Sequence, residues 1–384
     1  MLVNSLEKSI LTALYMFWEV FWPLVLGFGI SAIVQAFVAH NKIGRLLGKN
    51  NLKQAGLASF LGMVSSSCSY AAVALARSLF TKGASFLNAM IFEIASTNLV
   101  IELGIILLVL MGWQFALAEI IGGLIMIAVV FIVFKIILPK NIEEKAREQA
   151  QKGLLGRMEG HAQMDMSVSG TGSFWSKFFS KRGFTVVSHY YVMDWVSVWQ
   201  DIVLGFLIAG FLTVFVPQNF WRAFFFSDNP LLSGIVGPLV GPIVAIVSFV
   251  CSVGNIPLAA VLWNGGISFG GVISFIYADL IVLPILDIYR KYYGWKPTLY
   301  ILIVFYATMV AAGYITEILF SVFGFVPKEH TVKAITEGIK FNSTSVVNIV
   351  FLMASLLLLN RFFRTRGMEM LKMMNKAPEK SHHH

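Results

Sequence analysis

Charged residues are scarce in this sequence, and the scarcity argues against a soluble fold. Only 13% of the 384 residues are Asp, Glu, Lys or Arg, whereas a typical soluble domain has about 25%. Cysteine is scarcer still: the two cysteines both lie in apolar segments, which argues against a secreted disulfide framework. The sequence has no glycine-rich P-loop to indicate a nucleotide-driven pump, and no nucleic-acid-binding motif accompanies the net charge of +9.

Long apolar runs are abundant instead. Hydrophobic residues make up 57% of the chain. Apolar runs of about 18 or more residues recur along the whole length, and each is long enough to cross a hydrocarbon core of about 30 Å as a helix. The chain is therefore predicted to be an all-α polytopic membrane protein. The first run, 13–39, shows no signal-peptide cleavage site and is predicted to be a retained helix.

The two halves of the sequence resemble each other at a nearly constant offset. Cys68-Ser69 recurs as Cys251-Ser252, at an offset of 251 − 68 = 183. The further matches are 79–86 with 262–269 at the same offset, Gly112-Trp113 with Gly294-Trp295 after a one-residue gap, and 25–28 with 203–206. Several matches in one order predict two copies of one multi-helix unit.

Basic residues change sides between the two copies. Loop 40–54 carries four basic residues and no acid, while its counterpart 218–230 has one Arg and one Asp. Conversely, turn 111–114 is uncharged, while its counterpart 290–296 has three basic residues. Because Lys and Arg accumulate in cytoplasmic loops, the second copy is predicted to be inverted, with the amino terminus outside and the carboxyl terminus in the cytoplasm.

This orientation requires 55–110 to cross the membrane an odd number of times. Residues 56–80 are therefore predicted to enter and return as a broken or re-entrant hairpin around Cys68, and 84–111 to cross outward with a break near 96–98. In the second copy the break lies around Cys251. The residues expected to interrupt the helix there are Gly234, Gly237, Pro238, Gly241, Pro242, Gly254 and Pro257.

These predictions divide the chain into five segments. They are transmembrane repeat 1 at 13–138, a basic cytoplasmic linker with an interfacial amphipathic stretch at 139–194, the inverted transmembrane repeat 2 at 195–325, a C-terminal transmembrane helix at 345–360, and a basic tail with a histidine-tag stub at 361–384. The expected location is a bacterial or archaeal cytoplasmic (inner) membrane, with anionic lipid at the cytoplasmic face.

Helix breaks inside a membrane are tolerated where protein buries them or where they line a cavity, and transporters with inverted repeats bind their substrates at such breaks. The substrate-binding candidates are Ser66, Ser67, Cys68, Ser69, Tyr70, Thr97, Asn98, Cys251, Ser252 and Asn255. The alternative is that these small residues only let helices pack closely. The cysteines themselves have three interpretations: inert residues, thiol ligands for a soft ion, or a redox pair.

Acidic residues inside apolar segments are the second signal, because a charge at the bilayer centre costs about 2.5–3.5 kcal/mol or more. Glu93, Glu102 and Asp279 flank the predicted breaks and are candidates for coupling to a proton or sodium ion. The alternative is simple pairing inside the bundle. The other acids in apolar segments are Glu19, Glu119, Asp201, Asp287 and Glu317.

The linker concentrates soft ligands. Met158, His161, Met164 and Met166 place thioether and imidazole groups within nine residues, and such ligands suit Cu(I). A flexible polar loop with ordinary methionines is the alternative interpretation.

The chain resembles the bacterial predicted-permease family that includes the ArsP-type exporters of trivalent organoarsenicals. The motifs that carry the resemblance are Ser66-Ser67-Cys68-Ser69, Lys82-Gly83-Ala84-Ser85-Phe86, Ala95-Ser96-Thr97-Asn98, and Cys251-Ser252 with Asn255-Ile256-Pro257. They cover both transmembrane halves and imply a permease. The chain lacks the Pro-Phe-Cys-Ser-Cys run of the arsenical exporters and keeps one thiol there, Cys68.

The expected function is an inner-membrane secondary transporter without enzymatic activity or cofactor. It would export a small thiophilic solute, such as a trivalent organoarsenical, a soft metal or a sulfur compound, bound between the repeats near the bilayer midplane. The alternative is a membrane thiol–disulfide electron carrier that uses Cys68 and Cys251. A third class, an intramembrane hydrolase, is not supported, because no Ser-His or paired-Asp arrangement stands out in the sequence.

Overall fold

The computed structural model describes residues 2–37, 46–65, 69–151, 176, 178, 180–248, 252–329 and 343–369. Within these ranges every regular element is a helix. Five helices are long and apolar enough to cross a membrane, or up to seven if each of two bent helix pairs counts as one span. The predicted class, an all-α polytopic membrane protein, is confirmed.

The two halves of the chain contain similar series of helices. The first half contains α1 (Leu2–Phe37), α3 (Leu52–Ser65), α4 (Ser69–Thr81), α5 (Phe86–Asn98), α6 (Ile101–Leu110) and α7 (Trp113–Ile137). The second contains α11 (Lys181–Phe215), α12 (Gln218–Phe224), α13 (Pro230–Ser248), α14 (Ser252–Asn264), α15 (Phe269–Tyr277), the 3-10 turn η2 (Ala278–Ile281), α16 (Leu283–Tyr293) and α17 (Trp295–Val322). Helices α8 (Lys140–Gln151) and α18 (Ser343–Arg364) lie between and after these halves.

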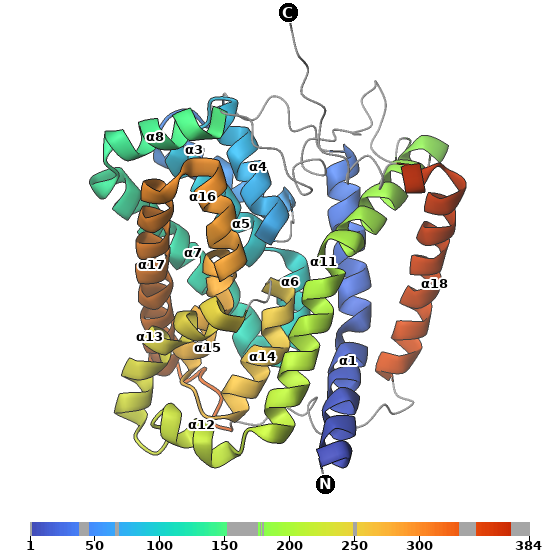
Figure 1. Cartoon of the computed structure of the whole chain (residues 1–384), viewed down its shortest axis with the longest axis vertical. Coiled ribbons are helices and arrows are strands. Elements are labelled where there is room, and N and C mark those ends of the chain that lie inside the picture. Colours follow the sequence, from blue (N-terminus) through green and yellow to red (C-terminus); the bar gives the residue numbers. More distant parts are fainter. Residues whose placement is uncertain are drawn as a thin grey trace, which may run out of the picture.

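Two short-helix pairs lie at opposite ends of the molecule. Helices α3 and α4 lie toward the end that carries α8, whereas α13 and α14 lie toward the end that carries α12 (Figure 1). The residues that join each pair, 66–68 and 249–251, are outside the described residues. The predicted break near 96–98 is present, because α5 ends at Asn98 and α6 begins at Ile101.

The prediction that glycine–proline pairs interrupt the helix before Cys251 was wrong. Pro238 and Pro242 lie inside α13, together with Gly234, Gly237 and Gly241, while Gly254 and Pro257 lie inside α14. Proline removes a backbone donor, but side chains of neighbouring helices in a membrane bundle can satisfy the loosened carbonyls. Here α17 supplies hydroxyls beside the affected carbonyls of Gly234 and Pro238: Tyr314 donates to the carbonyl oxygen of the next residue, Ile235, and Tyr306 to that of Leu239.

The same turn geometry begins α5 and α15. Gly83 has φ of 109° and Gly266 has φ of 92°, in a region that glycine tolerates and other residues rarely adopt. Two residues later, Ser85 and Ser268 cap their helices by accepting the backbone N–H three residues on. Both pairs are separated by 183 residues, since 266 − 83 and 268 − 85 give the same value.

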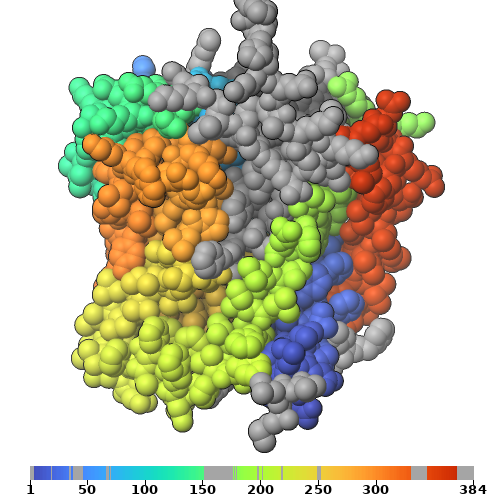
Figure 2. All heavy atoms as spheres, in the orientation of Figure 1, coloured from blue at the N-terminus to red at the C-terminus, as the bar shows by residue number. Residues whose placement is uncertain are grey.

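Helix α18 lies at the edge of the molecule beside α1 (Figure 2). The segments Asn4–Trp18 and Val20–Ile33 of α1 are bent by 48°. At this bend Asn348 of α18 donates to the carbonyl oxygen of Trp18 (2.7 Å) and accepts from the backbone N–H of Trp22 (3.0 Å). In a straight helix the N–H of Trp22 would donate to the carbonyl oxygen of Trp18. The side-chain amide of Asn348 therefore takes the place of one backbone hydrogen bond of α1.

Helix α8 lies across one end of the bundle (Figure 1). Arg147 donates to the carbonyl oxygens of Phe80 (2.9 Å) and Ala84 (3.1 Å), and its guanidinium lies over the Phe80 ring. In the other direction, Arg77 of α4 donates to the carbonyl oxygen of Ala150, near the end of α8 (2.9 Å). The polar helix is therefore attached to the turn between α4 and α5.

Candidate functional site

Asp279 lies where the two halves meet. Its carboxylate accepts a hydrogen bond of 2.6 Å from the hydroxyl of Ser69, the first residue of α4, and both side chains are buried. The hydroxyl of Ser252, on α14, acts on the same carboxyl, whose other oxygen, Oδ1, has no hydrogen-bond partner among the described residues. One buried acid therefore interacts with side chains from both halves of the chain.

Glu93 forms a second connection between the halves. It lies on α5, is fully buried, and accepts a hydrogen bond from the hydroxyl of Tyr289 on α16. Its other carboxyl oxygen, Oε2, is buried without a hydrogen-bond partner in the described part of the chain. The charges of Glu93 and Asp279 are close enough to act on each other. The structure therefore brings together two of the three predicted coupling residues.

Glu119 on α7 is a third buried acid beside this pair. Both of its carboxyl oxygens are buried without a hydrogen-bond partner among the described residues, and the charge of Asp279 acts on it. The hydroxyl of Tyr277 donates to the backbone carbonyl of Glu119 (2.8 Å) and so holds α7 against α15. In the described chain, none of the groups that act on these three carboxyls is basic.

Two asparagines complete the polar residues near the helix ends. Asn98 is the last residue of α5, and Asn255 lies in the first turn of α14. Both are fully buried, and in each the amide nitrogen and oxygen have no hydrogen-bond partner among the described residues. Leaving a buried polar group unpaired costs about 1–3 kcal/mol, so these amides offer hydrogen bonds to a ligand.

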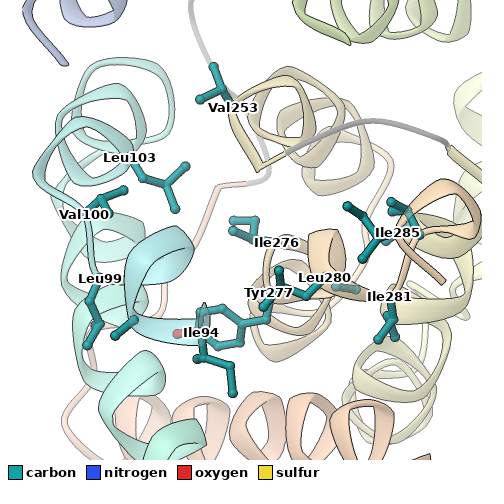
Figure 3. Close-up of a cluster of buried hydrophobic side chains, with 14 of the residues drawn as sticks. Ile94, Leu99, Val100, Leu103, Val253, Ile276, Tyr277, Leu280, Ile281 and Ile285 are labelled. Carbon is teal, nitrogen blue, oxygen red and sulfur yellow. The ribbon is translucent and has the colours of Figure 1, made fainter. Parts of the chain in front are cut away.

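Apolar side chains surround the polar groups. Figure 3 shows Leu99 and Val100, from the break between α5 and α6, on one side and Ile276 and Tyr277 of α15 on the other, with Val253 of α14 nearby. All are buried in the hydrophobic core. This apolar packing lowers the local dielectric, which strengthens the electrostatic interaction between the buried acids.

Other predicted site residues have different environments. The hydroxyl of Thr97 donates to the carbonyl oxygens of Glu93 and Ile94 in its own helix. Glu102, in the first turn of α6, lies against α1, because a Cβ at Gly27 would collide with it. The structure thus places Glu102 beside α1 and Glu93 beside α16.

Several predicted residues cannot be placed. Ser66, Ser67, Cys68 and Cys251 lie outside the described residues, as do Met158, His161, Met164, Met166 and the side chains of Tyr70, Glu19 and Asp201. Among the residues that the structure does describe, no group of three His, Cys, Asp or Glu side chains is arranged to hold a metal ion. The roles proposed for both thiols and for the linker ligands stay predictions.

Sequence reasoning missed Tyr289 and Tyr277 and did not assign Glu119 to the site. A usable signal was present, because a phenol hydroxyl in an apolar segment needs a hydrogen-bond partner when it is buried. What the sequence did not indicate was which helix supplies that partner: Tyr289 bonds to α5, and Tyr277 bonds to α7.

Comparison with known proteins agrees with this membrane architecture. The sequence profile of the ArsP_1 family, described as "Predicted permease", matches residues 5–318. The Mycobacterium tuberculosis protein named "Putative permease Rv2963" is 53% identical over 347 residues, which cover 90% of this chain and 86% of that protein. The resemblance inferred from the motifs is confirmed, and the chain belongs to the predicted-permease family.

Proposed function

We propose that this permease moves a small solute through the interface between its two halves, with the substrate site around Asp279. The observation that carries the proposal is the convergence on one carboxylate of Ser69 from the first half and Ser252 from the second. A ligand bound there would contact residues of both halves. Transporters commonly place their substrate and coupling-ion sites at such an interface, near the bilayer midplane.

The two halves are proposed to be inverted repeats with broken or re-entrant helix pairs. The recurrence of Gly83 as Gly266 and of Ser85 as Ser268 supports the duplication, as do Gly112 and Gly294, which precede α7 and α17 with φ of 104° and 87°. The inversion is supported by the opposite ends toward which α3–α4 and α13–α14 lie in Figure 1. Inverted repeats allow one half to rock against the other around a fixed site.

The end that carries α8 is proposed to face the cytoplasm. Lys82 and Arg147 lie there, together with Lys291 in the last turn of α16, which α8 contacts. The α12 end carries Arg222 and Asp228, which balance in charge. Because basic loops stay inside, the amino terminus lies outside and the end of α18 lies in the cytoplasm.

Glu93 and Asp279 are proposed to couple transport to a proton or sodium ion, with Glu119 as a third member. A charged carboxylate at this depth is costly, and no basic group compensates these three in the described chain. Binding of a cation removes that cost. Glu102 is a weaker candidate because it lies against α1.

The solute is proposed to be thiophilic and the transport to be efflux. Cys68 immediately precedes Ser69, and Cys251 immediately precedes Ser252, so each thiol is one residue from a side chain that interacts with Asp279. Thiols suit soft ions and metalloids. A trivalent organoarsenical, a soft metal and a sulfur compound are the candidate solutes.

A survival screen tests this function. Cells that express the permease are exposed to trivalent arsenicals, copper, silver and sulfur oxyanions, and the screen is repeated with Cys68→Ser, Cys251→Ser and Asp279→Asn. We expect resistance to one thiophilic compound and its loss in all three variants. Resistance that persists without the thiols contradicts a thiophilic site. A reversible disulfide between Cys68 and Cys251 in thiol-trapping experiments would instead favour the electron carrier.

A further inference from the structure

A pocket of about 450 Å³ lies on the side of the molecule, within its membrane-spanning part. We call it the lateral pocket. Its lining includes Asn98, Ile101, Gly104, Leu108, Glu119 and Leu124, from α5, α6 and α7. Ile101, Leu108 and Leu124 are each at least half exposed. Since these helices are spans, the pocket opens toward the hydrocarbon of the bilayer.

Polar groups lie at the buried side of this apolar pocket. Asn98 is fully buried and Glu119 is 1% exposed, and the polar side-chain atoms of both have no hydrogen-bond partner among the described residues. The hydroxyl of Tyr277, two residues before Asp279, donates to the backbone carbonyl of Glu119 (2.8 Å), so Glu119 both lines the lateral pocket and contacts the segment that leads to Asp279. The pocket is therefore adjacent to the proposed substrate site, on the side that faces lipid.

We propose that the lateral pocket admits the solute sideways, from the hydrocarbon of the bilayer, and that this solute is an amphipathic molecule without negative charge. Its apolar part would lie on Ile101, Leu108 and Leu124, and a hydrogen-bond-donating end would meet Glu119 and Asn98. The inference rests on the proposed function, because it names the route to the Asp279 site and the solute class that can take it.

The side chains that line the pocket determine which class of solute it can admit. No Lys, Arg or His side chain is among the lining residues, so an anion would lose its hydration in the pocket without meeting a compensating positive charge. A purely apolar occupant, such as a lipid tail, leaves the carboxyl of Glu119 and the amide of Asn98 unpaired, which costs about 1–3 kcal/mol for each group. The volume lies within the roughly 300–1,000 Å³ of small-molecule sites.

Gly104 provides a way to close the pocket without disturbing the fold. It lines the pocket, and a Cβ added to it meets no atom within 4 Å, so Gly104→Phe fills open space. Gly56 on α3 is the matched control: it is exposed, a Cβ there also meets nothing within 4 Å, and it does not line the pocket.

Photolabelling of the full-length protein in lipid nanodiscs tests the proposal. The probe is a benzyl alcohol with a photoactivatable diazirine on its ring, and the benzoic acid with the same ring is the anionic comparison. Labelled peptides are identified by mass spectrometry. We expect the alcohol to label α6 and α7 around the pocket, several-fold less labelling in Gly104→Phe, no change in Gly56→Phe, and weak labelling by the acid.

Three results would overturn the proposal. The first is alcohol labelling that Gly104→Phe does not reduce, because it would reflect partition into lipid. The second is equal labelling by the acid. The third is Gly104-sensitive labelling only by a phospholipid with a diazirine on its tail, which makes the pocket a lipid site.

A transport measurement separates this inference from the proposed function. With the compound found in the survival screen, we expect Gly104→Phe and Asp279→Asn both to lose transport and Gly56→Phe to keep it. If Asp279→Asn loses transport and Gly104→Phe keeps it, the central site stands and lateral entry is wrong. If Asp279→Asn keeps transport, the proposed function is wrong, whatever the probe labels.

Discussion

The hydroxyl of Ser69 and the carboxylate of Asp279 are 210 residues apart in the sequence and within 2.6 Å of each other in the structure. Both are buried, and each belongs to a different half of the chain. A relative movement of the halves therefore has to stretch, break or carry along this bond. Through this hydrogen bond, a ligand bound at Asp279 and the relative position of the two halves can influence each other.

Removing the hydroxyl tests the structural role of this pair. Ser69→Ala leaves one oxygen of Asp279 without its donor, so we expect the free energy of unfolding to fall by about 1–3 kcal/mol. The measurement is thermal unfolding of the purified protein in detergent. Ser274→Ala is the control, because Ser274 is also buried but donates within its own helix, to the carbonyl of Gly271. Equal losses in both variants would contradict the role assigned to Ser69.

The phenol of Tyr289 can be tested against a neighbour one helical turn away. Tyr289→Phe removes the hydrogen bond to Glu93, and we expect a loss of about 1–3 kcal/mol in stability. Tyr293→Phe removes a buried hydroxyl that has no hydrogen-bond partner among the described residues, so its effect is expected to be neutral or stabilising. Thermal unfolding of both variants measures the difference. A Tyr293→Phe variant as unstable as Tyr289→Phe would count against the assignment.

The inserted amide of Asn348 predicts how α18 is attached. Asn348→Leu leaves the carbonyl of Trp18 and the N–H of Trp22 without this partner, and we expect α18 to separate from α1 more readily. Limited proteolysis before α18, together with thermal unfolding, detects the change. Asn360→Leu is the control, since Asn360 is exposed on the same helix. Equal protease sensitivity of the two variants would argue against the amide as the attachment.

The attachment of α8 depends on Arg147. Arg147→Gln removes the bonds to the carbonyls of Phe80 and Ala84, so we expect faster hydrogen exchange throughout 140–151. Lys145→Gln, which changes an exposed residue of the same helix by the same charge, is expected to leave exchange unchanged. If both variants exchange alike, net charge holds α8 and the two carbonyl contacts do not.

Thiol labelling tests the orientation. Cysteines placed at Lys82 and Lys291 are expected to resist a membrane-impermeant maleimide in intact cells, while a cysteine at Asp228 reacts. The unmodified protein, with Cys68 and Cys251, gives the background. Labelling of Lys82→Cys and Asp228→Cys from the same side would reject the proposed topology.

The helical class and one helix break could be predicted from the length of the apolar segments. The break between Asn98 and Ile101 was predicted near 96–98, because 84–111 is longer than one membrane crossing requires. The glycine–proline pairs of α13 were wrongly predicted to interrupt their helix. Local sequence does not contain the reason, since the hydroxyls of Tyr306 and Tyr314 come from α17 and contact α13 only after the helices pack.

Ser69 and Asp279 were both named from the sequence as candidates, one for substrate binding and one for coupling, but nothing in the sequence indicated that they bond to each other. Glu119 was recognised only as an acid in an apolar run, and its position beside Asp279 follows from how α7 packs on α15. Pairings across the two halves depend on tertiary packing, which periodicity does not encode.

Helix α8 contacts the turns of both halves. Arg147 bonds to the turn after α4, whereas Gln149 donates to the carbonyl of Lys291, beside the turn between α16 and α17. Rocking of the halves would change the distance between these anchor points. In the proposed orientation, an antibody fragment that bound α8 from the cytoplasm and fixed its position would therefore slow the transport cycle without entering the membrane.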